Sequence, residues 1–242
     1  MSCFDQEQYD IRCEWGLPGV EQIASSDVIV IVDVLSFSTS VEVAVGRGVT
    51  VFPYRWKDDT AKAYAQQRSA ELAGSRNNES GKYSLAPSSL IRAHRGLRLV
   101  LPSPNGSALS FEAMSHGAVV FAGSLRNATA VASEAQAVGQ RITVIPAGER
   151  WPDGSLRPAI EDLIGAGAII KQLKGTRSPE SSVAVAAFEE AAAQLQNRLF
   201  SCSSGRELIA RGFVDDVEIA AELNVSRVVP KLVDQAFVAE LR

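Results

Sequence analysis

The run Val28-Ile-Val-Ile-Val32, followed at once by Asp33-Val-Leu-Ser-Phe-Ser-Thr-Ser40, decides the fold of this chain. Consecutive β-branched residues without polar alternation are typical of a strand that is covered on both faces, as in a parallel sheet. The hydroxyl residues that follow are common at helix N-caps, and the apolar residues up to Gly46 predict a helix. The regular part of the chain therefore opens with a strand, a loop and a helix.

Similar units recur along the chain. Further strands are predicted at 49–52, 97–101, 118–122 and 142–145, and helices at 59–72, at 107–116 and after Asn127. Strands that alternate with helices in this way form a mostly parallel sheet with helices on both faces. The predicted fold class is therefore α/β.

The pattern becomes helical after Pro158. Helices are predicted at 160–173, 180–199, 205–210 and 216–223, with one late strand at 227–229. No linker rich in Pro, Ser or Gly divides the chain, so we expect a single α/β domain over 1–242. Two closely packed lobes, about 1–155 and 156–242, remain an alternative. The polar segment 74–95 is equally consistent with a connector and with an active-site lid.

Composition excludes several classes of protein. The 24 Lys and Arg against 28 Asp and Glu give a net charge of −4, which disfavours nucleic acid. No run of about 20 apolar residues could cross a membrane. The three cysteines have no Cys-x-x-Cys spacing, and the two histidines exclude a multi-histidine zinc site. We expect a cytoplasmic protein, and the sequence leaves open whether it forms a homodimer.

The polar residues gather directly after the predicted strands, where ligands bind in open parallel sheets. Each of them has a plain alternative role as a helix cap or a turn residue, but hydroxyls, backbone N–H groups and arginines at several helix N-termini together suit a phosphate or carboxylate. The candidate phosphate ligands are Ser36, Ser38, Thr39, Asn105, Gly106, Ser107, Asn127, and Arg126 or Arg206.

Three carboxylates are candidate catalytic residues and metal ligands: Asp33, Glu161 and Asp162. Asp33 ends an apolar strand, so it needs donors or a cation to remain charged, whereas Glu161 and Asp162 could equally interact with a helix dipole. If they converge to about 5 Å, each pair repels by roughly 3 kcal/mol at an effective dielectric of 20. Oxygen ligands without Cys or His favour Mg²⁺.

Five motifs, in this order and spacing, resemble the 2-phosphosulfolactate phosphatase family. They are Asp33–Ser40, Ser103–Ser107, Gly123–Asn127, Ala147-Gly148 and Glu161–Gly167. The resemblance covers nearly the whole chain. It implies an α/β fold and Mg²⁺-dependent hydrolysis of 2-phospho-3-sulfolactate to 3-sulfolactate and phosphate, a step toward coenzyme M.

The chain departs from the family pattern at two places. Ser36 and Phe37 stand where the family has Arg and Ala, and Gly74-Ser-Arg76 stands where it has Gly-Glu-Arg. A hydroxyl in place of a guanidinium removes a charge and a fork of donors from the predicted anion site. Two alternatives therefore stay open: a phosphatase for a different phosphorylated hydroxy acid, and a non-catalytic anion-binding relative.

Overall fold

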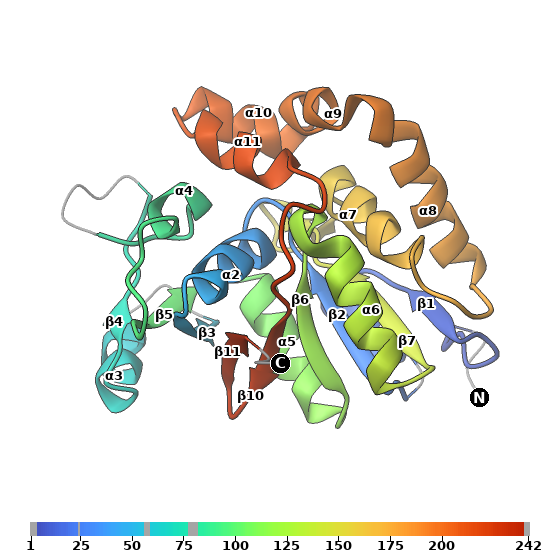
Figure 1. Ribbon diagram of the computed structural model, residues 1–242, viewed down its shortest axis with the longest axis horizontal. Coiled ribbons are helices and arrows are strands. Elements are labelled where there is room, and N and C mark those ends of the chain that lie inside the picture. Colours follow the sequence, from blue (N-terminus) through green and yellow to red (C-terminus); the bar gives the residue numbers. More distant parts are fainter. Residues whose placement is uncertain (1–3, 24, 56–58, 77–81, 240–242) are drawn as a thin grey trace.

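The computed structural model describes residues 4–23, 25–55, 59–76 and 82–239. Its described residues form an α/β fold around a nine-stranded, mostly parallel sheet (Figure 1). From edge to edge the strands are β1 (Ile11–Cys13), β7 (Ile142–Pro146), β2 (Val28–Val32), β6 (Val119–Gly123), β10 (Pro230–Val233), β11 (Ala236–Ala239), β3 (Thr50–Tyr54), β5 (Arg98–Pro102) and β4 (Glu71–Leu72). The predicted fold class is confirmed.

Strand β2 lies inside the sheet, as its apolar run predicts. It pairs in parallel with β6 on one side and β7 on the other, with Val30 opposite both Phe121 and Val144. All five of its residues are buried. Because both neighbours run parallel to β2, the loops that leave the carboxyl ends of these three strands meet at one edge of the sheet.

Helices cover both faces of the sheet. Val28, Val30 and Val32 belong to a core that contains α6 (Ala128–Val138) and α7 (Ile160–Ile170). Ile29 and Ile31 pack instead with α1 (Gly16–Gln22) and α5 (Gly106–Ser115). Alternate residues of a strand point to opposite faces, so these two groups of helices lie on opposite sides.

The C-terminal hairpin interrupts the parallel sheet. Strands β10 and β11 are antiparallel to each other, and they also pair antiparallel with β6 and β3. The strand predicted at 227–229 is wrong, because the first strand of the hairpin begins at Pro230. The preceding backbone bonds to side chains instead: the Val228 carbonyl accepts from Asn127 and the Val228 N–H donates to Ser226.

The remaining helices lie in the chain either between β2 and β5 or after α7. They are α2 (Phe37–Gly46), α3 (Thr60–Gln67), α4 (Pro87–Leu90), α8 (Pro179–Ala191), α9 (Leu195–Ser201), α10 (Ser203–Ala210) and α11 (Val214–Ala221). Helices α8 to α11 arch from the edge near β1 to a position above α2 in the view of Figure 1. This arch brings α10 to the loops at the strand ends. In the described part of the chain, no helix has the length and apolar character needed to cross a bilayer.

Candidate active site

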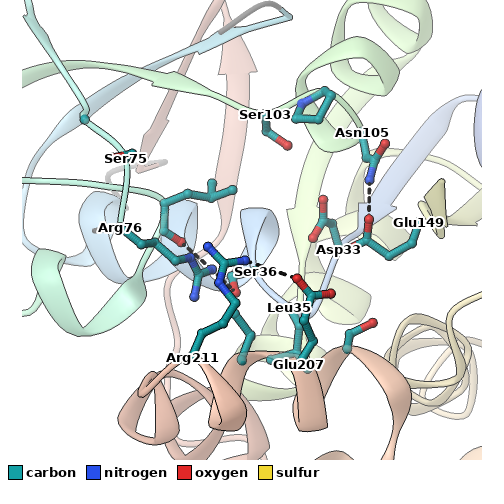
Figure 2. Close-up of a pocket in the computed structure, with 15 residues that line it drawn as sticks. Asp33, Leu35, Ser36, Ser75, Arg76, Ser103, Asn105, Glu149, Glu207 and Arg211 are labelled. Carbon is teal, nitrogen blue, oxygen red and sulfur yellow. Dashed lines mark hydrogen bonds and ion pairs between the residues drawn. The ribbon is translucent and has the colours of Figure 1, made fainter. Parts of the chain in front are cut away.

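A pocket of about 240 Å³ opens where the loops after β2 and β5 meet α10 (Figure 2). Its lining includes Asp33 and Ser36 after β2, Arg76 after β4, Asn105 after β5, Glu149 after β7, and Glu207 and Arg211 at α10. Asp33, Asn105 and Glu149 lie on one side of the pocket, and Arg76 and Arg211 lie on the other (Figure 2). The pocket therefore has an acidic wall and a basic wall.

Asp33 is held at the end of β2 by the turn into α2. Its carboxylate accepts the Phe37 N–H at 2.9 Å, and its own N–H donates to the Ser38 hydroxyl at 3.1 Å. Burial raises the pKa of Asp33 to about 6, and the negative charge of Glu161 adds to the rise. The Gly106 N–H at the start of α5 opposes that rise. Asp33 is thus a buried carboxylate at the pocket wall.

Glu149 faces the same space from the start of a short hairpin, β8 (Glu149–Arg150) and β9 (Leu156–Arg157). Its carboxylate accepts from the Asn105 side-chain amide N–H at 3.0 Å, and Arg150 donates to the Asn105 side-chain oxygen Oδ1 at 3.1 Å. Burial raises the pKa of Glu149 to about 7, with further contributions from the negative charges of Asp33 and Glu161. Two carboxylates that disfavour each other's ionisation therefore share one wall.

Asp162 joins two of the loops that form the site. One of its carboxylate oxygens accepts the Val34 N–H at 2.7 Å and the other accepts the Gly148 N–H at 2.9 Å. Burial, followed by the charge of Asp33, raises the pKa of Asp162 well above its usual range. Glu161, beside it in the first turn of α7, is also buried. Asp162 therefore fixes the loops after β2 and β7 relative to each other.

The donor set can be compared with what a magnesium ion needs. Among the described residues, no group of three or more His, Cys, Asp or Glu side chains is arranged to hold a metal ion. Both oxygens of Asp162 are taken by backbone N–H groups, so the expected set of Asp33, Glu161 and Asp162 does not offer three available carboxylates. Asp33 and Glu149 do line the pocket. A pair of carboxylates fits Mg²⁺, which is often held by one or two carboxylates together with water and substrate phosphate.

Several hydroxyls that the sequence assigns to phosphate are used inside the fold. Ser38 donates to the Ile31 carbonyl at 2.9 Å and Thr39 donates to the Val34 carbonyl at 2.8 Å. Ser107 accepts the Tyr54 N–H at 3.1 Å. These three side chains are fully buried and do not line the pocket. Their contacts stabilise the turns that present Asp33 and Asn105.

Asn127 and Arg126 also lie outside the pocket lining. Asn127 accepts the Ser124 N–H at 2.8 Å and donates to the Val228 carbonyl at 3.0 Å. Arg126 forms an ion pair with the buried Glu42 at 2.6 Å. The structure therefore uses this motif to join β6 to the segment that leads into the C-terminal hairpin.

The other predicted phosphate ligands divide between the pocket and a separate hollow. Ser36 and Asn105 line the pocket, and Gly106 begins α5 beside Asp33. A Cβ atom at Gly106 would come within 2.2 Å of the Phe37 ring, so glycine is required by close packing. Arg206 is exposed on α10 and lines a different hollow beside Phe200.

Sequence reasoning left out two arginines of the basic wall. Arg76 donates from Nη2 to the Ser36 hydroxyl at 2.6 Å and pairs through Nη1 with Asp216 at 2.6 Å. It lies in the polar segment 74–95, of which 77–81 fall outside the described residues. Its signal in the sequence was Gly74-Ser-Arg76. Arg211 had no such signal, because only the fold brings α10 to the strand ends.

The chain is similar in sequence to known proteins over most of its length. A family model described as 2-phosphosulpholactate phosphatase matches residues 18–235. The 2-phosphosulfolactate phosphatase of Methanothermobacter thermautotrophicus is 30% identical over 212 residues, which cover 87% of this chain and 88% of that protein. A Carboxydothermus hydrogenoformans protein named "Probable 2-phosphosulfolactate phosphatase" is 30% identical over 213 residues, covering 86% and 87%. This chain therefore belongs to the 2-phosphosulfolactate phosphatase family.

Proposed function

We propose that this chain is a phosphoric monoester hydrolase that converts 2-phospho-3-sulfolactate to 3-sulfolactate and phosphate, with Mg²⁺ as its cofactor. The observation that carries the proposal is the pocket with opposite walls, in which Asp33 and Glu149 face Arg76 and Arg211. Its volume of about 240 Å³ lies below the usual range for drug-sized ligands, so a small substrate suits it. The names of the two similar proteins suggest the chemical identity of that substrate.

The acidic wall supports the proposal of a bound cation. A phosphate dianion at about 5 Å from Asp33 or Glu149 would be repelled by roughly 3 kcal/mol per charge pair at an effective dielectric of 20. The raised pKa values of both carboxylates mean that this wall already disfavours negative charge before a substrate binds. Mg²⁺ held by Asp33 and Glu149 would neutralise this wall and polarise the phosphoryl oxygens.

The residues around the two carboxylates keep them in position. Asn105 is held between Glu149 and Arg150, so its amide orients the Glu149 carboxylate toward the pocket. The Phe37 N–H does the same for Asp33. The Ser103 side chain adds a hydroxyl to the wall from the loop after β5. Rigid groups of this kind stabilise charge in a transition state without reorganising.

The proposal is tested by phosphate release from a panel of phosphomonoesters, with Mg²⁺ and with a chelator. We expect release from 2-phosphosulfolactate by the wild type with Mg²⁺ and a loss of at least about 100-fold in Asp33→Asn. Calorimetry should show weaker Mg²⁺ binding by Asp33→Asn than by Asp215→Asn, a control on the exposed part of α11. Equal rates for Asp33→Asn and the wild type would remove Asp33 from the mechanism.

Two other outcomes would favour the alternatives. Faster hydrolysis of a different phosphorylated hydroxy acid would replace the substrate but keep the reaction. Binding of 3-sulfolactate without phosphate release from any ester would favour an anion-binding protein.

A further inference from the structure

Two guanidinium groups stand together on the basic wall of the pocket. Arg76 comes from the segment after β4, and Arg211 comes from the C-terminal end of α10. Both lie over the ring of Phe213, each with its central carbon 5.5 Å from the ring centroid. The Phe213 ring therefore stabilises the positive charges of Arg76 and Arg211, which are far apart in the sequence, close to each other.

Arg76 is fixed in its orientation. Its side chain is only 10% exposed, and it is held by Asp216, by the Ser36 hydroxyl and by the Leu85 carbonyl. Asp216 is itself buried and also accepts the Ser88 N–H at 3.1 Å. The Nε–H group of Arg76 takes part in none of these contacts. Arg76 is thus a preorganised cation whose partners leave it donors for a ligand.

Arg211 is held far more loosely. Its contact with Glu207 at 3.1 Å joins two side chains that are 46% and 66% exposed. Exposed pairs of this kind contribute little to stability, so a ligand can replace Glu207 at small cost. Burial and the charge of Arg211 both lower the pKa of Arg76. The two cations therefore repel each other, and an anion between them would relieve the repulsion.

We propose that Arg76 and Arg211 bind the sulfonate of the substrate, which together with the carboxylate is one of the two acidic groups that do not react. This proposal rests on the proposed function. A sulfonate presents three oxygens in a tetrahedral arrangement, which suits two guanidinium groups from different elements, whereas one guanidinium fork satisfies a planar carboxylate. With the sulfonate on this wall, the phosphate faces Asp33 and Glu149. The reverse orientation would place the reacting ester away from both carboxylates.

The test compares two ligands that differ only in the sulfonate, 3-sulfolactate and lactate. Calorimetry with Mg²⁺ present would measure both ligands with the wild type, Arg211→Gln and a control, Arg198→Gln. Arg198 is an equally exposed arginine, ion-paired with Glu190 and lining a different hollow. We expect the wild type and the control to prefer 3-sulfolactate over lactate, and Arg211→Gln to reduce that preference at least about tenfold.

A second variant, Arg76→Lys, keeps the positive charge beside Asp216 but removes the planar fork. We expect it to fold, as judged by circular dichroism and thermal unfolding, and to reduce the preference for 3-sulfolactate by a similar factor. In kinetics, both variants should raise the KM for 2-phosphosulfolactate, whereas the control Arg198→Gln should leave it within about twofold of the wild type.

The subsite is refuted if the wild type binds 3-sulfolactate no better than lactate, or if Arg211→Gln keeps the full preference. Failure of the proposed function would look different. In that case no ester would release phosphate, while the calorimetric preference for 3-sulfolactate would persist and would still depend on Arg211.

Discussion

Replacement of Glu149 by glutamine should make the metal-free protein more stable at neutral and alkaline pH. Glu149 is largely buried beside Asp33, and its pKa rises from the usual value of 4.5 to about 7. The folded state therefore binds a proton more tightly than the unfolded state does. As pH rises through this interval the folded protein loses that proton and must bury a charge, so its free energy of unfolding falls. A glutamine side chain at this position would carry no charge at any pH.

The size of this stability difference follows from the pKa shift of Glu149. A rise from 4.5 to about 7 corresponds to at most about 3 kcal/mol at 1.36 kcal/mol per pKa unit. Most of this destabilisation is present at pH 8, and less than about 1 kcal/mol is present at pH 5. Asp33 titrates in both proteins and its charge repels that of Glu149, so the difference between them measures the charge at position 149 together with this coupling. The glutamine side-chain oxygen can still accept from Asn105, which keeps the site's geometry.

Urea unfolding at pH 5 and pH 8, with a chelator and then with Mg²⁺, measures this effect. Without metal, Glu149→Gln should be more stable than the wild type by about 3 kcal/mol at pH 8 and by less than about 1 kcal/mol at pH 5. The control Glu21→Gln, at an exposed position of α1, should match the wild type at both pH values. Mg²⁺ should stabilise the wild type more than Glu149→Gln, because binding to the folded state adds to its stability. A Glu149→Gln protein that is no more stable than the wild type at pH 8 would refute the reasoning.

Three further substitutions test positions that lie outside the pocket. Asn127→Ala should lower the free energy of unfolding by about 2 kcal/mol, measured in urea, because the buried Ser124 N–H loses its acceptor; activity per folded molecule should persist. Arg206→Gln should leave phosphate release within about twofold of the wild type, since this exposed side chain lines a different hollow. Gly167→Ala should cost about 3 kcal/mol in thermal unfolding, because its Cβ would lie 1.9 Å from the Ala184 carbonyl oxygen.

The sequence predicted the sheet where apolar strands are long and buried on both faces. Strand β2 is the strongest case, since its five residues admit few other structures. Strand β1 was missed because it is short, and Ile11 to Cys13 includes Arg12, a buried arginine that hides the apolar pattern. Only one late strand was predicted, at 227–229, whereas the chain forms the hairpin of β10 and β11 from Pro230 onward. The antiparallel pairing of this hairpin departs from the repeated parallel units that precede it.

The position of the site in the fold was easier to predict than the residues that line it. Parallel strands end at one edge, so Asp33 and Asn105 could be brought together from strand order alone. Glu149 stood in the sequence directly after a strand, but nothing there showed that its carboxylate turns toward Asp33. That direction depends on Gly148, whose φ of +67° permits the turn into the β8–β9 hairpin. Backbone conformation of this kind is not visible in residue type.

Several hydroxyl side chains were predicted to bind phosphate because a sequence does not show which of them form hydrogen bonds with the backbone. A serine after a strand can cap the turn, as Ser38 does, or face the pocket, as Ser36 does, and the two stand only two residues apart. At Ser36 the partner is Arg76, which comes from the segment after β4 and donates to the Ser36 hydroxyl. A guanidinium is thus present beside position 36, although the side chain at that position is a serine. Residue type at one position therefore cannot establish whether this pocket has lost its capacity to bind an anion; the charge has to be counted over every element that reaches the pocket.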